Sequence, residues 1–240
     1  MDYARPVSAA ESRRISMTFG ALYLITFATS IPALWLYQPV LDNPAGYVAG
    51  AGHDNRILLG AFLELLLIIA NIGTATVVFP LLKRANETCA VSYVTARVME
   101  STFILVGILS VVAVVTLRQN PSSGSDATLG TIAYTLADIK DWTFILGPGF
   151  VVGIGNGLLL GYLMYRSELV PRRMAILGLI GGPLIIITGV LALFGVIQWG
   201  GSVQSFATLP EAIWELLLGI YPLVWGFRAA APILRPAVAA

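Results

Sequence analysis

The chain has little charge and almost no side chains suited to metal or redox chemistry. Its 240 residues include one cysteine, Cys89, and one histidine, His53, and only 11% are charged. A single cysteine excludes an internal disulfide and a CxxC redox pair. A single histidine excludes bis-histidine haem ligation and a three-histidine zinc site. The sequence therefore has no haem, disulfide-redox or histidine-zinc signature, and it specifies no cofactor.

Charge of one sign is also missing, since the net charge is +1 and the basic residues are scattered. This excludes the basic footprint of a nucleic-acid-binding protein. What the chain has is apolar surface, with 57% hydrophobic residues and a mean hydropathy of +0.83. Soluble domains carry about a quarter charged residues. The composition predicts an integral membrane protein whose main partner is the lipid bilayer.

The long apolar runs predict an all-α, polytopic fold. A membrane-crossing helix needs about 20 mostly apolar residues, and six stretches qualify, at 16–37, 57–82, 91–117, 142–165, 174–197 and 210–227. We expect one transmembrane domain over 1–240. In the loop after the third span, Leu129, Ile132, Leu136 and Ile139 share one face of a helix, which predicts a short helix at 126–141 along the outer interface.

Basic residues indicate the orientation of the spans. One side of the predicted bundle holds most of them: Arg5, Arg13, Arg14, Lys83, Arg84, Arg166, Arg172, Arg173, Arg228 and Arg235. By the positive-inside bias, both termini should be cytoplasmic. The connections on that side are short, so the second and third spans, and the fourth and fifth, should be antiparallel neighbours.

Four glycines recur at intervals of four in the fourth span, namely Gly149, Gly153, Gly157 and Gly161. A dinucleotide-binding fingerprint requires a strand before its glycines, and the flanks here are bilayer-length apolar runs. We interpret the glycines as a helix-packing face, a glycine zipper, that lets another backbone approach closely. The fifth span, which carries GLIGGP from Gly178, is the natural partner.

Three segments carry a family resemblance: ANIGTATVVFPLLKRANE, TARVMESTFILVGILSVVAVVTLR, and the run from DWTFILGPGF to GLIGGP. They resemble the bacterial integral-membrane family catalogued as domain of unknown function 4386, over about residues 12–227. The resemblance implies a multi-pass protein of the bacterial cytoplasmic (inner) membrane. It implies no reaction and no catalytic residue.

A first group of polar residues lies deep inside the predicted spans. An ionisable side chain near a span centre costs about 2.5 to 3.5 kcal/mol and usually faces the bundle interior. Asn71, Glu100 and Asn156 fall about 15 Å from the predicted cytoplasmic edge, with Arg97 one turn shallower. Arg97 and Glu100 are three residues apart and can pair. The layer is either a buried ion pair bonded by the two asparagines, or the lining of a site for a polar or anionic group.

A second layer is predicted in the outer half, where Glu64 and Glu215 lie about 8 to 12 Å below the outer edge. No basic residue is predicted at that depth. The two carboxylates would share a proton or bind a cation, an amine or a metal; alternatively they reach water separately. Glu64 and Asn71 are seven residues apart on one face, so one cavity could join both layers. Glu211, three residues after Thr208, is interpreted as a helix cap.

The leading functional hypothesis is the binding or transport of a small or amphipathic molecule in a polar pocket between the second, third, fourth and sixth spans. Its predicted lining consists of Glu64, Asn71, Arg97, Glu100, Asn156 and Glu215. One alternative is a membrane-embedded enzyme that uses Glu64 and Glu215 as acid and base or as metal ligands. Another is a structural or accessory subunit. A small-molecule or lipid ligand and self-association are both compatible with the sequence.

Overall fold

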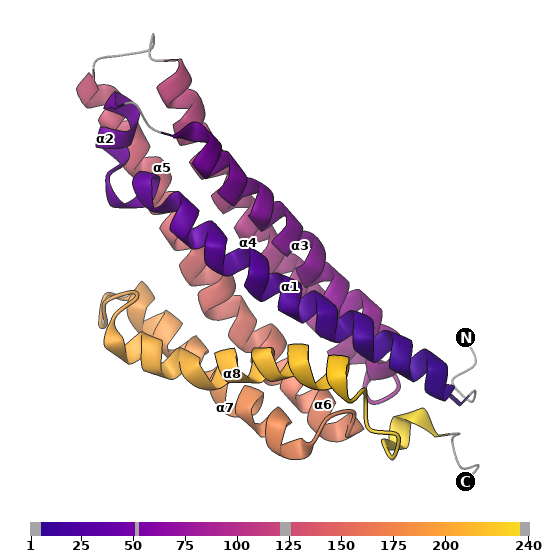
Figure 1. Cartoon of the computed structure of the whole chain (residues 1–240). Helices are drawn as coiled ribbons and strands as arrows, with labels where there is room; N and C mark the ends of the chain where they lie inside the picture. The colour runs from indigo at the N-terminus through magenta and orange to yellow at the C-terminus, as the bar shows by residue number, and fades with distance from the viewer. Residues whose placement is uncertain (1–5, 51–52, 121–125, 236–240) are drawn as a thin grey trace.

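The computed structural model describes residues 6–50, 53–120 and 126–235, and these residues contain helices and no strand. The helices, labelled in Figure 1, are α1 (Ala9–Asp42), α2 (Pro44–Ala49), α3 (Asp54–Leu82), α4 (Glu87–Gln119), α5 (Asp126–Leu146), α6 (Gly161–Ser167), α7 (Arg172–Leu193) and α8 (Ser202–Val224). Two π-helical segments, η2 (Gly147–Val151) and η3 (Gly153–Leu160), join α5 to α6, and a 3₁₀ turn, η4 (Pro232–Leu234), follows α8.

Six helices in the described part of the chain are long and apolar enough to cross a membrane. They are α1, α3, α4, the continuous run Asp126–Ser167, α7 and α8. The predicted all-α fold with six spans is confirmed. Local signals set several boundaries, since the side chains of Ser8 and Asn86 cap the starts of α1 and α4, and Glu168, with φ of 56°, ends α6.

The stretch at 126–141 is helical as predicted, but it is not a separate helix on the interface. It is the first part of a 42-residue run, Asp126–Ser167, that includes the fourth span. The face with Leu129, Ala133, Ala137 and Lys140 is buried, and α5 packs against α2 and α4. A helix that buries one stripe in protein has no need to lie on the membrane surface, and no proline stands between 126 and the fourth span.

The last two spans also differ from their predicted bounds. The fifth ends at Leu193 rather than at 197, and Gly195 follows with a φ of +68°, a conformation that favours glycine. The sixth begins at Ser202, so Pro210 lies inside α8 and does not start it. Helices in membranes tolerate such a proline where neighbouring groups satisfy the freed carbonyl.

The six spans pack as a closed ring. In ring order, α1 contacts α3, α3 contacts α4, α4 contacts α5 and the π-helical segments, η3 contacts α7, α7 contacts α8, and α8 returns to α1. The predicted antiparallel neighbours, α3 with α4 and α6 with α7, are in contact. Figure 1 shows α7 and α8 diverging from the bundle of α1, α3, α4 and α5, so the molecule has the shape of a V.

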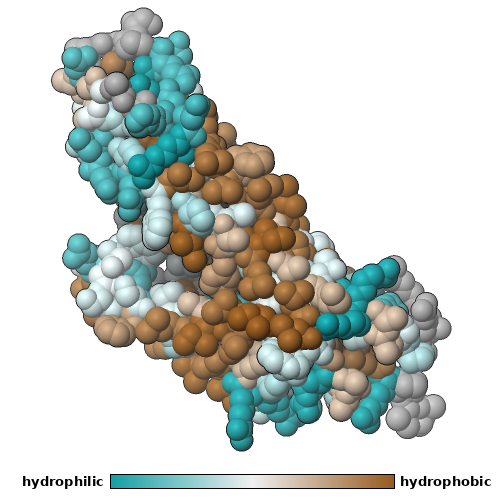
Figure 2. Space-filling model, in the orientation of Figure 1, coloured by the Kyte–Doolittle hydropathy of each residue, from teal (hydrophilic) through white to brown (hydrophobic). Residues whose placement is uncertain are grey.

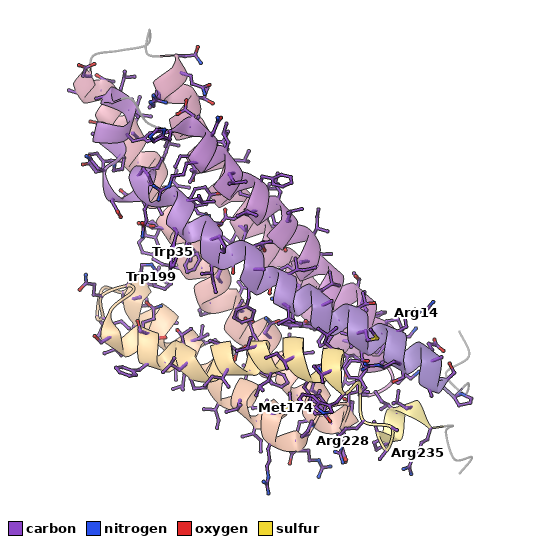
Figure 3. The ribbon with its side chains drawn as sticks, viewed as in Figure 1. Arg14, Trp35, Met174, Trp199, Arg228 and Arg235 are labelled. Carbon is purple, nitrogen blue, oxygen red and sulfur yellow. The ribbon has the colours of Figure 1, made fainter. Side chains whose placement is uncertain are left out.

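The two arms of the V meet at a close crossing of α1 and α8. A Cβ atom at Gly20 would lie 2.5 Å from the carbonyl oxygen of Gly219, and one at Gly219 would lie 2.7 Å from Leu24 Cδ2. At the same end, which we call the terminal end, Val7 N donates to Leu234 O at 3.3 Å. The opposite end, marked by Trp35 and Trp199 in Figure 3, is called the open end.

The surface is divided into three zones. Figure 2 shows a hydrophobic middle between a hydrophilic region over α2 and the adjoining helix ends and another at the terminal end. Large apolar side chains in the middle are well exposed, for example Phe62 at 55%, Ile69 at 66% and Leu109 at 63%. Such exposure is costly in water and expected in lipid. The protein is therefore a multi-pass membrane protein.

The glycine-rich segment brings its backbone against α7. A Cβ at Gly153 would lie 2.7 Å from the carbonyl oxygen of Gly182, and one at Gly182 would lie 2.6 Å from that of Gly153. The segment is π-helical, a conformation that is rare and often found at functional sites. Trp214 Nε1 of α8 donates to the carbonyl oxygen of Asn156 in this segment at 3.0 Å, so α8 is bonded to the same stretch.

Candidate functional site

A cavity of about 430 Å³ lies inside the ring of helices. Every span contributes to its wall, because residues of α1, α3, α4, α5, η2, α7 and α8 line it, together with Trp199 and Gly200 between α7 and α8. Figure 3 shows Trp35 of α1 and Trp199 at the open end, where the two arms diverge. The volume falls within the range of small-molecule sites, about 300 to 1,000 Å³.

The first cluster of the wall joins α3 and α4. Arg97 Nη1 donates to Glu100 Oε2 at 2.7 Å, and Arg97 Nη2 donates to Asn71 Oδ1 at 2.6 Å. Asn71 Nδ2 donates to Glu100 Oε1 at 3.0 Å, which closes a three-membered ring of bonds. All three side chains are 5% exposed or less. The Arg97–Glu100 pair predicted from the spacing forms, and Asn71 satisfies both of its members.

The second cluster joins α3 and α5 and corrects an expectation. Lys140 Nζ lies 2.6 Å and 2.7 Å from the two carboxylate oxygens of Glu64, and Tyr37 of α1 donates to Glu64 Oε2 at 3.0 Å. The expectation that no basic residue reaches this depth is wrong. Lys140 was assigned to an interfacial helix, but the continuous helix carries its side chain into the bundle, where it is 3% exposed. Glu64 is a paired carboxylate, and among the described residues no hydrogen bond joins it to Glu215.

The third cluster joins α1, η3 and α8. Asn156 is fully buried, and its Nδ2 donates to Glu215 Oε1. Tyr23 of α1 donates to Asn156 Oδ1 at 3.3 Å and shares a hydrogen bond of 3.1 Å with Tyr93. Asn156 therefore bonds Glu215 and Tyr23. The first interpretation, in which it bonds the Arg97–Glu100 pair, does not describe the structure. It lies behind the cavity wall and positions the Glu215 carboxylate.

Glu211 on α8 was interpreted as a helix cap, and the structure contradicts this. The helix begins at Ser202, so Glu211 lies in the third turn, and Thr208 Oγ1 donates to the carbonyl oxygen of Gln204 instead. Glu211 is 1% exposed and lines the cavity. Neither of its carboxylate oxygens has a hydrogen-bond partner among the described residues.

The structure brings the predicted site residues to one cavity but in different roles. Five of the six line it, namely Glu64, Asn71, Arg97, Glu100 and Glu215, and Asn156 supports the last of them. The sequence reasoning missed Lys140 and Glu211. The signal for Lys140 was available, because Leu129, Ala133, Leu136, Lys140 and Thr143 continue one helical stripe toward the fourth span. The signal for Glu211 was hidden, because Pro210 resembles a helix start.

The charges of the cavity wall do not balance. Its lining holds four carboxyl groups, on Glu64, Glu100, Glu211 and Glu215, and two cationic groups, on Arg97 and Lys140. Each cation is paired with one carboxylate. Within the part of the chain that the structure describes, the two carboxyl groups on α8 have one hydrogen-bond partner between them, the side-chain amide of Asn156, which bonds Glu215. The acidic excess is thus confined to α8.

The rest of the wall is apolar and aromatic. Its members come from several helices: Phe27, Leu34, Leu67, Ile104, Phe144, Val152, Ile185 and Trp199. The combination of a few convergent polar groups with apolar walls is typical of sites for small organic molecules. The described residues contain no group of three or more His, Cys, Asp or Glu side chains that could hold a metal ion.

A match to a protein-family model identifies the family of the chain. Residues 18–226 match the model of a protein family described as domain of unknown function (DUF4386). Because this match covers most of the 240 residues, the chain belongs to that family. No curated protein and no solved structure matches the chain.

Proposed function

We propose that this member of the family binds, and transports, a small amphipathic molecule in the cavity between its helices. The observation that carries the proposal is the cavity of about 430 Å³, in which buried ionic groups of α3, α4, α5 and α8 face apolar side chains. Charged groups inside a bundle are costly and typically mark substrate or ion pathways. An interior needed only for packing would be filled by apolar side chains.

In this proposal the whole chain, residues 1–240, acts as one transmembrane domain, because its first and last spans close the ring. The terminal end faces the cytoplasm. In support of this, Arg14, Arg228 and Arg235 lie together at that end in Figure 3, and basic residues favour the cytoplasmic side. The membrane is then the bacterial inner membrane, as the family resemblance implies.

The direction of access follows from the V shape. The contact of Gly20 with Gly219 closes the cavity toward the cytoplasm, while the arms diverge at Trp35 and Trp199 (Figure 3). A ligand therefore enters from the outer half of the membrane. For transport, α1 and α8 would have to separate at the Gly20–Gly219 crossing, as the helices of alternating-access transporters do around a fixed site.

The geometry gives less support to an enzyme that uses Glu64 and Glu215 together. Lys140 and Tyr37 already engage Glu64, so its carboxylate is not a free base or metal ligand beside Glu215. An accessory subunit would require a docking face for a partner helix, and the glycines of η3 already pack against α7.

The test is to fill the cavity and ask whether a bound molecule is lost. Ser30 of α1 lines the cavity, whereas Ala28, two residues earlier, is exposed on the outer surface. We expect native mass spectrometry of the protein, released from membranes in mild detergent, to detect a retained small molecule. The Ser30→Phe variant should lose it and Ala28→Phe should keep it. Identical ligand-free spectra for all three proteins would contradict the proposal.

A further inference from the structure

We propose that the ligand carries a primary ammonium group and that Glu211, assisted by Glu215, is its binding partner. This inference rests on the proposed function and specifies the chemical class of the molecule. It gives the carboxylates of α8 a ligand-binding role, whereas the ionic groups of the other helices are paired with one another.

The first step of the argument is the isolation of Glu211. An ionised carboxylate taken out of water needs a partner, because without one its burial costs several kcal/mol. Glu211 is 1% exposed, and no donor among the described residues reaches its oxygens. A ligand cation would supply the partner that this carboxylate lacks.

The second step is that both cations that line the cavity are already paired with carboxylates. Arg97 donates through Nη1 to Glu100 and through Nη2 and Nε to Asn71. Lys140 Nζ contacts both oxygens of Glu64. Neither can turn to Glu211 without abandoning a buried carboxylate. A cation carried by a molecule in the cavity would supply the compensating charge.

The third step is that the protein makes room for the Glu211 carboxylate. A Cβ atom at Gly181 would lie 2.7 Å from Glu211 Oε2, and one at Gly157 would lie 3.0 Å from it. A larger residue would also overlap backbone, since a Cβ at Gly181 would lie 2.6 Å from Glu211 N and one at Gly157 would lie 2.3 Å from Gly182 Cα. The two glycines therefore let α7, η3 and α8 approach closely, and the Glu211 carboxylate lies against this close contact.

The fourth step concerns the second carboxylate. Glu215 follows Glu211 by one helical turn, so the two side chains point to the same side of α8, and both line the cavity. Asn156 donates to Glu215 Oε1, and among the described residues no donor bonds the other oxygen, Oε2. A primary ammonium has three N–H donors and can bond both carboxylates.

The fifth step selects an organic ammonium ion over an inorganic cation. Beside its ion pairs, the wall facing α8 carries apolar and aromatic side chains, among them Phe27, Leu67, Ile104 and Phe144. An inorganic cation would leave this surface unoccupied. A molecule with an ammonium group at one end and a hydrocarbon or aromatic body at the other matches both parts of the wall.

The experiment compares three probes of one shape and different charge: 4-phenylbutylamine, 4-phenylbutan-1-ol and 4-phenylbutyrate. Binding is measured by calorimetry at pH 7 on the full chain in phosphatidylcholine nanodiscs, with empty nanodiscs to subtract partition into lipid. We expect the amine to bind wild-type protein at least about tenfold more tightly than the alcohol. The acid should not bind.

Two variants locate the effect. Glu211→Gln keeps the shape of the side chain and removes its charge, so the amine should lose about tenfold or more in affinity while the alcohol is unchanged. Glu87→Gln, at an exposed carboxylate outside the cavity, is the matched control and should bind like wild type. An unfolded variant would lose the alcohol as well, so alcohol binding also reports on the fold.

The outcomes separate this inference from the proposed function. If the alcohol binds as tightly as the amine, and only Ser30→Phe abolishes both, the cavity binds ligands and the ammonium assignment is wrong. Equal amine binding by wild type and Glu211→Gln would also overturn it. If none of the probes binds to the wild-type protein, the ammonium assignment is overturned, and calorimetry also gives no support for ligand binding in the cavity.

One further arm distinguishes the source of the ammonium group, which free amines and phosphatidylethanolamine headgroups share. Half of the phosphatidylcholine is replaced by phosphatidylethanolamine. If a lipid headgroup occupies the site, it competes and the apparent affinity of 4-phenylbutylamine falls. If the native ligand is a free amine, the affinity stays the same.

Discussion

The two walls of the cavity differ in whether their buried ionic groups have partners. On the wall formed by α3, α4 and α5, each ionic group has a partner, in the Arg97–Glu100 and Glu64–Lys140 pairs. On the wall formed by α8, Glu211 has no hydrogen-bond partner among the described residues, and Glu215 has an amide. The Glu64–Lys140 pair joins α3 to α5, and Asn71 of α3 bonds the Arg97–Glu100 pair of α4. Because breaking a buried pair is expensive, the first wall has a structural role, and the second is the one to which our proposal assigns the ligand.

The largest expected effect is the loss of Arg97. In the Arg97→Ala variant, Glu100 becomes a buried charge without a cation, and we expect the free energy of unfolding to fall by about 3 to 5 kcal/mol. Thermal unfolding in detergent, followed by circular dichroism, measures this. The double variant Arg97→Met, Glu100→Leu removes both charges and should recover most of the loss. A mild effect of Arg97→Ala alone would show that this wall is not structural.

Lys140→Met should have the second largest effect, a destabilisation of about 3 kcal/mol, because Glu64 loses its cation. Tyr37 would still donate to Glu64, so the loss should be smaller than for Arg97→Ala. The same unfolding measurement applies. Adding Glu64→Gln should restore stability, and a double variant no better than Lys140→Met would mean that Lys140 contributes through packing instead.

Gly157→Ala should destabilise the protein by about 1 to 3 kcal/mol, as overpacking of a close contact does. The new Cβ would overlap the backbone of Gly182 and approach Glu211 Oε2. Gly73→Ala on α3 is the matched control, since its Cβ would meet only the flexible side chain of Leu22. Equal melting temperatures for the two variants would contradict the close approach of η3 to α7.

Glu211→Gln should have the smallest effect on stability, a change of less than about 1 kcal/mol or a small gain, because it removes an unpartnered buried acid. On the other wall, by contrast, Arg97→Ala and Lys140→Met are expected to lower the free energy of unfolding strongly. The check is the melting temperature of the ligand-free protein beside that of Arg97→Ala. A loss as large as that of Arg97→Ala would place Glu211 in the structural network and erase the difference between the walls.

The spans and the ion pair within one helix were predictable from sequence, because both depend on local spacing. Apolar runs of bilayer length predicted all six spans, and the separation of Arg97 and Glu100 predicted their pairing. The partner of Glu64 was not predicted, because Lys140 was assigned to a surface helix. The stripe from Leu129 to Thr143 indicated a continuous helix, but the contacts of that face with α2 and α4 join segments far apart in the sequence, and its pattern does not specify them.

That Glu211 is buried in the cavity wall could not be predicted from the sequence either. A Thr-x-x-Glu pattern after a loop normally marks a helix start, whereas α8 begins at Ser202 and packs against α7 and α1. The π-helical form of 147–151 and 153–160 was not predicted either. The depth of each polar residue in the membrane could be calculated from its position in the sequence. Which residue of another helix it bonds required the three-dimensional arrangement.

A density map of the protein in nanodiscs, purified without added ligand and determined by cryo-electron microscopy, tests the central claim most directly. The account predicts non-protein density in the cavity that reaches Glu211 and Glu215, with Arg97 still bonded to Glu100 and Lys140 to Glu64. A map in which α8 packs directly on α3 and α4, with Arg97 bonded to Glu211 and no space between the walls, would contradict it.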